Sequence, residues 1–404
     1  MMKRFVYMAM LLLLSVPVVA QKKQISQAKT NIKNGTNLEN TEKSMRQLLA
    51  DSANSRNEKV WLLLFNSVRK QYEQGNEKLY LKQNYDTAQL FLLAKKMFDV
   101  LEEFDSIESI PDANGHVKVH YRSKHAAFLD RYRQNIYSGG SFFIRKQRYQ
   151  DAYNMYDTYI RCASHPLFSQ YNYAETDKWL PEASYWSVFC GYKLKNPQLA
   201  MEYSGMAKLD SAHHVYLLQY MSELYLQKGD TASYVSTLTE GFEQYPSYSF
   251  FCPRLVDYYC LQHRFDNALE VVNKALRTEP ANWLYRFAKS TILMNTGEYD
   301  DCISLCDELI GENDTIPDVF YNAGLSYYRK AIEKEQEVRS DRKRKSEVLE
   351  LYRRSLPYLE RYRALAPDQS KRWLMPLYTI YLNLNMGEEF EEMERLLIQS
   401  EASK

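Results

Sequence analysis

The side chains best suited to chemistry in this sequence are three neighbouring histidines, His116, His120 and His125. A pair spaced i, i+4 on a helix could share one face and bind a transition metal. No carboxylate or cysteine accompanies them in a recognised arrangement, so exposed histidines at the start of a helix are the favoured interpretation. The sequence also has no phosphate-binding loop, dinucleotide fingerprint, Gly-x-Ser-x-Gly elbow or His-Glu-x-x-His motif. We therefore expect a protein that is not an enzyme, with no catalytic residues, cofactor or metal.

The cysteines offer a second place where chemistry could occur. Cys302 and Cys306 lie one helical turn apart, as metal ligands sometimes do, but no second pair completes a four-ligand site. The chain has six cysteines in 404 residues, far below the density of a disulfide-stapled scaffold. We expect mostly buried thiols that act as small apolar side chains, and the pattern leaves open whether any of them form disulfides.

Residues 1–20 have the pattern of a signal peptide. Lys3 and Arg4 precede an apolar run, and small residues follow at its end. We expect cleavage after Ala20 and a mature protein in the periplasm or outside the cell, without an integral membrane segment. Lys and Arg total 52 against 51 Asp and Glu, so no net positive field favours nucleic acid as a partner.

The elements that position these side chains are predicted to be helices throughout. Gly and Pro number only 13 and 12, and no stretch alternates apolar and polar residues as a strand does. A period of 34 residues relates Gly229, His263 and Gly297, and the same period relates Pro246 and Pro280. That length is typical of a repeated pair of helices.

One segment carries the repeat pattern clearly, with a large residue, tyrosine, alanines and a closing proline at regular positions: Leu255, Tyr259, Phe265, Ala268, Val272, Ala275 and Pro280. This pattern resembles the tetratricopeptide repeat (TPR) family. The resemblance implies an all-α fold, an α-solenoid of stacked antiparallel helix pairs that forms a TPR superhelix. A single pair leaves much of its apolar face in water, so the pairs must stack to be stable.

The register divides the chain into an N-terminal helical region with degenerate repeats at 21–118 and a TPR solenoid at 119–404. The expected units lie near 133–166, 181–214, 215–248, 249–282, 283–316, 317–369 and 370–400. The unit at 317–369 contains an insertion, whose charged stretch from Arg339 to Lys345 is predicted to be a solvated helical extension, with a partner-docking element as the alternative.

The resemblance also implies where a partner binds, because in this family the first helices of successive units line a concave groove that receives a protein or peptide. By register, the groove residues are Tyr185, Phe189, Tyr192, Lys193, Gln219, Glu223, Asp257, Thr291, Tyr321, Tyr328 and Arg329. We therefore expect an exported scaffold for protein–protein interaction in the cell envelope, and the pattern leaves the identity of its partner open. The many aromatic residues also suit stacking on sugars, so a carbohydrate-binding envelope protein with a glycan ligand is the alternative.

Six short Asp-Ser/Thr triplets resemble acceptor sites of a bacterial O-glycosylation system for exported proteins. Their hydroxyl residues are Ser52, Thr87, Ser106, Ser211, Thr231 and Thr315. The alternative is that Asp, Ser and Thr gather at the ends of helices because they cap free backbone N–H groups. The sequence does not decide between modification and capping.

Overall fold

The computed structural model describes residues 21–112, 114–336 and 342–402. Within these ranges the chain forms helices and turns and contains no strand, which confirms the all-α prediction. The chain divides between Lys228 and Gly229 into two compact units. Residues 1–20, the expected signal peptide, lie outside the described ranges, and no helix within those ranges is long and apolar enough to cross a bilayer.

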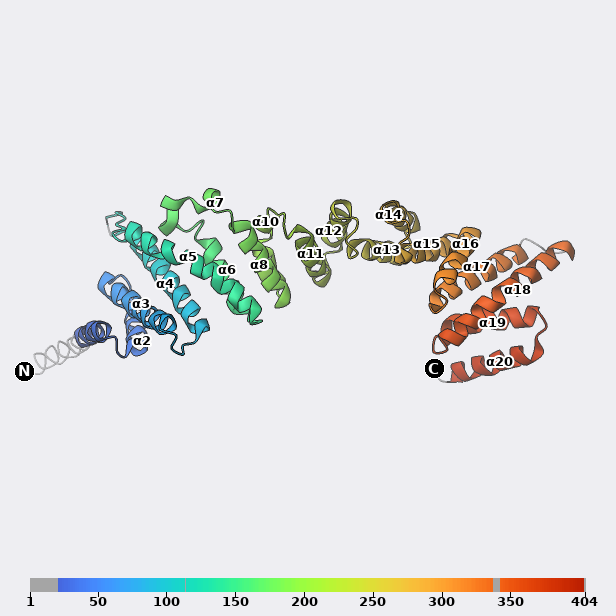
Figure 1. The fold of residues 1–404 in the computed structure, drawn as a ribbon, viewed down its shortest axis with the longest axis horizontal. Coiled ribbons are helices and arrows are strands. Elements are labelled where there is room, and N and C mark those ends of the chain that lie inside the picture. The colour runs from blue at the N-terminus through green and yellow to red at the C-terminus, as the bar shows by residue number, and fades with distance from the viewer. Residues whose placement is uncertain (1–20, 113, 337–341, 403–404) are drawn as a thin grey trace, which may run out of the picture. The chain divides into compact units, whose positions relative to one another are not determined.

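The first unit is a series of helices that pack against their neighbours in chain order (Figure 1). Residues 21–34 are helical. The elements that follow are α2 (Leu38–Leu49), α3 (Glu58–Tyr80), α4 (Thr87–Glu108), α5 (Arg122–Arg145), α6 (Tyr149–Arg161), the 3-10 helix η1 (Pro166–Tyr171), α7 (Tyr173–Thr176), α8 (Leu180–Lys193), α9 (Pro197–Glu202), α10 (Ser204–Ala207) and α11 (His214–Lys228).

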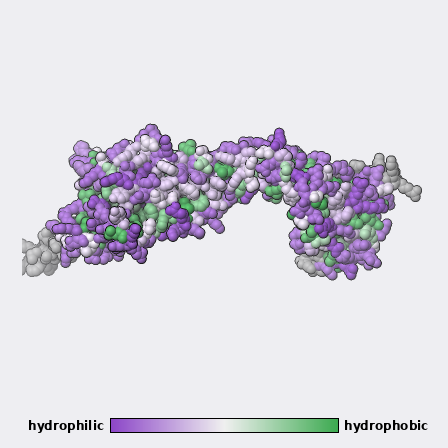
Figure 2. All heavy atoms as spheres, viewed as in Figure 1, coloured by the Kyte–Doolittle hydropathy of each residue, from purple (hydrophilic) through white to green (hydrophobic). Residues whose placement is uncertain are grey.

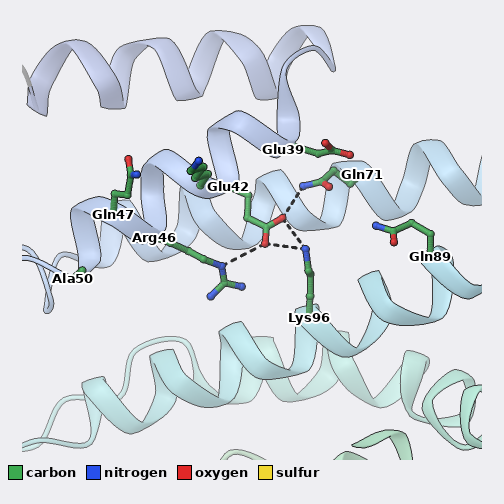
Figure 3. Close-up of a pocket in the computed structure, with 9 residues that line it drawn as sticks. Glu39, Glu42, Arg46, Gln47, Ala50, Gln71, Gln89 and Lys96 are labelled. Carbon is green, nitrogen blue, oxygen red and sulfur yellow. Dashed lines mark hydrogen bonds and ion pairs between the residues drawn. The ribbon is translucent and has the colours of Figure 1, made fainter. Parts of the chain in front are cut away.

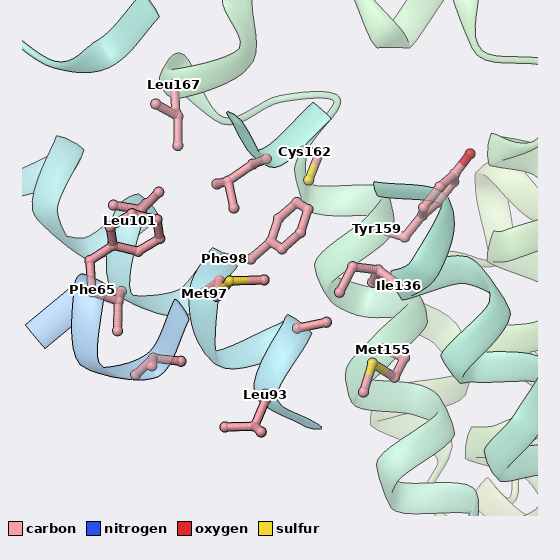
Figure 4. Packing of buried hydrophobic residues seen from close by; sticks show 14 of the residues in the cluster. Phe65, Leu93, Met97, Phe98, Leu101, Ile136, Met155, Tyr159, Cys162 and Leu167 are labelled. Atoms are coloured by element: carbon pink, nitrogen blue, oxygen red, sulfur yellow. The ribbon is translucent and has the colours of Figure 1, made fainter. Parts of the chain in front are cut away.

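The core of the first unit runs along α3, α4, α5 and α6 without a break. Phe98 of α4, Ile136 of α5 and Met155 of α6 are completely buried in the same apolar cluster (Figure 4). Full burial of one such side chain stabilises a fold by about 1.5 to 3 kcal/mol. The layer fixes these helices to one another and so fixes the surfaces that they present to solvent.

An insertion between α6 and α8 is fastened to this core by one buried arginine. The Arg133 guanidinium lies 3.8 Å from the ring centroid of Tyr159 and 3.9 Å from that of Tyr173. It forms an ion pair of 2.6 Å with Asp177, whose carboxylate also accepts a 2.7 Å hydrogen bond from the Tyr159 hydroxyl. Asp177 lies directly after α7, so the arginine binds the inserted segment to α5.

The second unit consists of helix pairs. Its elements are α12 (Thr231–Gln244), α13 (Phe251–Leu261), α14 (Phe265–Thr278), α15 (Trp283–Thr296), α16 (Tyr299–Glu312), α17 (Pro317–Gln336), α18 (Arg342–Leu365), α19 (Ser370–Asn383) and α20 (Gly387–Ala402). The helices α12, α14 and α16 begin at Thr231, Phe265 and Tyr299, which are 34 residues apart in each case. The predicted period is therefore the period of the helix pairs.

The turns show the physical origin of the period. Gly229, His263 and Gly297 all have a positive φ, of 73°, 55° and 87°, and each lies just before a second helix. Lys195, a further 34 residues upstream, has a φ of 53° and precedes α9 in the same way. A left-handed residue ends one helix and reverses the chain, and glycine adopts that conformation at no steric cost.

Two elements depart from a regular repeat. The second helix of the expected unit 181–214 is broken at Tyr203 into α9 and α10, because Tyr203 has a φ of −109° and a ψ of 10°. The expected unit 215–248 has its first helix, α11, in the first compact unit and its second helix, α12, in the second.

The insertion in the unit 317–369 lengthens both of its helices, α17 and α18. Ala331 of α17 and Tyr352 of α18 are completely buried in one cluster, so the base of the lengthened pair is packed rather than solvated. Of the charged stretch, residues 339–341 lie outside the described ranges, and residues 342–345 are helical.

All six cysteines are free thiols, and five of them are buried. This confirms the interpretation of the cysteines as apolar packing residues. Burial raises the pKa of the Cys190 thiol to about 12, so this thiol stays protonated at neutral pH.

Ala268 of α14 tests the repeat register. Its side chain is completely buried between helices, so Ala268→Leu is expected to lower the free energy of unfolding by about 1 to 3 kcal/mol through overpacking. Thermal unfolding followed by circular dichroism measures the change. Glu270→Leu, at an exposed position of the same helix, is the matched control. An unchanged melting temperature for Ala268→Leu would show that the site has room for the larger side chain.

Candidate partner-binding surfaces

The first candidate surface lies on α8 and α11 and contains six of the eleven predicted groove residues. Phe189, Tyr192 and Lys193 lie within one turn of α8, and the Lys193 ammonium is 5.4 Å from the Phe189 ring centroid. The Tyr192 hydroxyl donates a 2.6 Å hydrogen bond to Glu223 of α11. Gln219 lies one turn before Glu223 on α11, so both helices contribute polar groups to a surface built on aromatic rings.

Tyr185 belongs to the support of this surface. Its side chain is only 3% exposed, and its ring is stacked on that of His213 at 4.4 Å. Burial raises the pKa of its hydroxyl well above the ordinary value, so the group stays neutral. Tyr185 therefore packs between helices, while Phe189 and Tyr192 are half-buried and remain partly exposed.

Two aromatic residues that the repeat register did not select complete the first surface. The Tyr220 ring is stacked on Tyr192 at 4.6 Å, and the Trp186 ring makes an edge contact with Phe189 at 5.6 Å. Trp186 is the immediate neighbour of Tyr185, and Tyr220 follows Gln219. Their proximity in sequence to the predicted groove residues is the signal that could have found them.

The second candidate surface lies in the second unit on the first helices α15, α17 and α19. Asn322 of α17 donates a 2.9 Å hydrogen bond to Thr291 of α15, and Arg329 donates one of 3.2 Å to the carbonyl of Met294. Tyr328 donates a 3.4 Å hydrogen bond to Thr379 of α19. The three helices therefore lie side by side.

Two further predicted residues belong to the second unit. The guanidinium of Arg372 lies over the Tyr321 ring, 3.9 Å from the centroid of that ring. Asp257 on α13 is exposed. The predicted groove residues thus form two groups, one in each compact unit.

Comparisons with known proteins return helical-repeat structures. No protein-family model and no curated protein sequence matches the chain. Among solved structures, a MamA double mutant is 14% identical, covers 47% of this chain and 97% of its own, and has a TM-score of 0.38. The C-terminal part of a TPR repeat-containing protein from Cytophaga hutchinsonii is 11% identical, and the match covers 64% of this chain and 92% of that one, with a TM-score of 0.44. Yeast Tom70 is 14% identical, and the match covers 94% of this chain and 91% of Tom70, with a TM-score of 0.29.

The helix pairs themselves, with turns that recur every 34 residues at Lys195, Gly229, His263 and Gly297, decide the class of fold. The fold is a tetratricopeptide-like helical repeat.

The histidines of this tetratricopeptide-like protein are not brought together. His125 is buried between the rings of Phe104 and Tyr121, at 5.6 and 5.4 Å, whereas His116 is exposed. The prediction of exposed histidines is therefore wrong for His125, because this residue lies on the face of α5 that packs against the core. Among the described residues no group of three or more His, Cys, Asp or Glu side chains has an arrangement that could hold a metal ion.

The burial of His125 makes the stability of the first unit pH-dependent. Burial, assisted by the charge of Lys124, lowers its pKa from 6.5 to about 4. The unfolded chain takes up the proton first, so this contribution to stability is complete above pH 6.5 and is lost as the pH falls toward 4. Between pH 7.5 and 5 we expect His125 to contribute a loss of about 1 to 2 kcal/mol, and this contribution should be absent in His125→Phe. Urea unfolding at both pH values measures the loss, with His116→Gln as the control. An equal loss in the His125→Phe variant would contradict this assignment.

The Asp-Ser/Thr triplets mostly lie at helix starts and turns. Asp51, Asp86 and Asp210 each accept a hydrogen bond from the backbone N–H two residues later, at 2.9 to 3.1 Å. Asp230 caps α12 by accepting from the N–H of Ser233. Asp86 and Asp230 are the N-caps of α4 and α12, and Asp51 and Asp210 stabilise turns, so bonding to the backbone accounts for four of the six aspartates. The hydroxyl residues themselves are exposed in five cases, at Ser52, Ser106, Ser211, Thr231 and Thr315, and half-buried at Thr87, and their modification stays a prediction.

Proposed function

We propose that this protein is an exported scaffold that binds another protein in the cell envelope and carries out no chemistry of its own. The observation that carries the proposal is the α8–α11 surface, where half-buried rings lie beside the exposed Lys193 and the fixed Tyr192–Glu223 pair. Aromatic side chains supply contact area at low conformational cost, and the polar groups around them set specificity.

The surface hydropathy supports recognition through such mixed surfaces. The visible face of each unit is mostly hydrophilic, and apolar residues occur there in small separate groups (Figure 2). A partner that binds such a surface relies on a few aromatic anchors with charged neighbours.

Differential capture tests the proposal. The wild-type protein and two variants are crosslinked in envelope fractions of the native host, and the captured proteins are compared by mass spectrometry. Phe189→Ala combined with Lys193→Ala is expected to weaken the capture of a reproducible partner about tenfold or more. Lys208→Ala removes the same charge at an exposed position of the first unit and should leave capture unchanged. If the partner binds both variants equally, the α8–α11 surface is not the site.

Export has its own test. We propose cleavage after Ala20, which predicts that mature protein from the native host begins at Gln21. The N-terminal sequence of protein from a periplasmic or secreted fraction measures this. An intact N-terminus in a cytoplasmic fraction would contradict export.

A glycan is the second candidate ligand, because Trp179 is 55% exposed and its ring lies 5.9 Å from that of Tyr137. An exposed indole supported by a second ring suits stacking on the face of a sugar. A glycan array probed with wild-type protein and with Trp179→Ala decides. A signal that is lost in the variant supports this function, and the absence of any signal rejects it.

A further inference from the structure

The N-terminal part of the first unit contains a polar groove that the repeat pattern does not predict. The groove lies across α2, α3 and α4 and has a volume of about 540 Å³ (Figure 3). Three cations line it, Lys43 and Arg46 from α2 and Lys96 from α4, together with the amide side chains of Gln47 and Gln89. It is separate from the α8–α11 surface.

A nearly buried carboxylate holds two of these cations in place. The Glu42 side chain is 10% exposed, and it lies 3.1 Å from the Lys96 ammonium and 3.3 Å from Nε of Arg46. Gln71 of α3 donates a third contact of 3.1 Å. Burial by itself raises the pKa of Glu42, but the Gln71 hydrogen bond and the Lys96 charge outweigh it and keep the pKa below 4.5. Glu42 is therefore ionised at neutral pH.

The cations keep donors that Glu42 does not use. Arg46 donates to Glu42 only through its Nε, and its two terminal nitrogens have no protein partner among the described residues. Arg46 and Lys96 extend toward one another from α2 and α4, with Glu42 between them (Figure 3). Their side chains are 42% and 41% exposed, so each is fixed at one side and open to a ligand at the other. Preorganised donors bind an anion with a smaller loss of side-chain entropy than mobile ones.

The fold alone does not account for this set of charges. Lys96 and Gln71 already contact both oxygens of Glu42, and these contacts join the three helices. The joint therefore needs neither Arg46 nor the exposed Lys43. With Glu39 and Glu42 as its acids, the groove lining carries a net charge of +1, from three cations and two carboxylates. A net charge of +1 is complementary to one added carboxylate.

We propose that this groove binds an acidic peptide segment of a protein partner. A Glu or Asp carboxylate of the segment pairs with the terminal nitrogens of Arg46 and with Lys96, and the amides of Gln47 and Gln89 pair with its backbone. Side-chain amides match backbone N–H and C=O groups, because they both donate and accept. An anionic membrane would instead favour a broad cluster of exposed cations. This groove is recessed and contains two acids, so it does not present such a cluster.

This inference rests on the proposed function only in taking a protein as the partner. Its test therefore uses purified full-length protein and a defined peptide, without any cellular fraction. Failure of the peptide test leaves the α8–α11 surface untouched, and failure of the capture test leaves the groove untouched.

The probe is a fluorescein-labelled peptide of alternating Glu and Ala residues, titrated with protein and followed by fluorescence anisotropy at low salt. We expect saturable binding, and we expect Lys96→Gln and Arg46→Gln each to raise the Kd about tenfold, which corresponds to one lost charged contact. Lys95→Gln is the matched control. Lys95 is the residue directly before Lys96 in α4 and carries the same charge, but its ammonium is held by Asp99 at 2.8 Å and does not line the groove. Its Kd should stay within about twofold of the wild-type value.

Competition and folding controls decide the remaining outcomes. Variants are compared only if their circular dichroism and melting temperature match those of the wild type. Lys43→Ala, at an exposed position without a partner contact, serves as the third groove variant if the others fail to fold. A peptide with Gln in place of Glu should not bind.

Three results would overturn the proposal. The first is no binding of the Glu–Ala peptide by wild-type protein, and the second is equal weakening by Lys95→Gln and Lys96→Gln. The third is displacement of the peptide by phosphatidylglycerol vesicles or inorganic phosphate at lower concentration than by unlabelled peptide, which would assign the groove to a phosphate-bearing ligand.

Discussion

Replacing Asp177 by Ala is expected to lower the free energy of unfolding of the first unit by about 3 to 5 kcal/mol, because it leaves the Arg133 guanidinium buried without its counter-ion. The side chains of Arg133 and Asp177 are only 8% and 6% exposed, so water cannot replace the lost carboxylate. The substitution also removes the acceptor of the Tyr159 hydroxyl and of the Trp179 backbone N–H. The inserted segment then loses its attachment to α5.

Urea unfolding followed by circular dichroism and tryptophan fluorescence measures the effect. Glu73→Ala is the control. The Glu73 side chain is 40% exposed and is the i, i+4 partner of Arg69, and such exposed pairs contribute at most about 0.5 kcal/mol. Arg133→Met combined with Asp177→Leu should recover much of the loss, since it removes both buried charges. A loss below about 1 kcal/mol for Asp177→Ala would mean that Arg133 reaches solvent in the variant.

The repeat architecture could be predicted because its signal is a local backbone requirement. Gly229, His263 and Gly297 mark the period in the sequence, and all three have the left-handed backbone that reverses the chain between two helices. Lys195 has the same backbone conformation but is not glycine, so its residue type gives no signal of the turn. Side chains that tolerate this conformation at a cost weaken the pattern without changing the fold.

The break between α9 and α10 could not be predicted, because it depends on tertiary contacts that override helix propensity. Tyr203 at the break donates a 2.5 Å hydrogen bond to Asp157 of α6, 46 residues earlier in the chain. A hydrogen bond over that distance holds the ring against its neighbour at the expense of one regular helical turn.

The surfaces were predicted less completely than the fold. Register selected Phe189, Tyr192 and Lys193 because they share a helix face, but it also selected Tyr185, which is buried. The groove around Glu42 gave no sequence signal, since its partners Gln71 and Lys96 are 29 and 54 residues away. In the N-terminal repeats, where glycine and proline are missing at the family's positions, no register was available to bring these residues together.

Gly191→Ala is expected to destabilise the first unit by about 3 kcal/mol, the upper part of the usual range for overpacking. Gly191 lies on α8 where α9 crosses it, and a Cβ added there would lie 2.4 Å from the backbone nitrogen of Ala200 and 2.7 Å from its Cα. Both atoms belong to the main chain of α9, so no rotation of a side chain relieves the contact. The two helices must separate, which opens a gap beside Ala200, itself completely buried.

A second glycine of the same helix pair makes the result specific to close packing. Gly205 of α10 has nothing within 4 Å of an added Cβ and a backbone outside the left-handed region, so Gly205→Ala should be neutral or stabilise the unit by about 0.5 to 1 kcal/mol. The melting temperatures of both variants, measured by circular dichroism, compare a crowded site with an open one under the same change of one methyl group. If Gly191→Ala melts at or above the wild-type temperature, α8 and α9 do not approach as closely as their backbones indicate. In that case the small residues of the repeat do not set the spacing between helices.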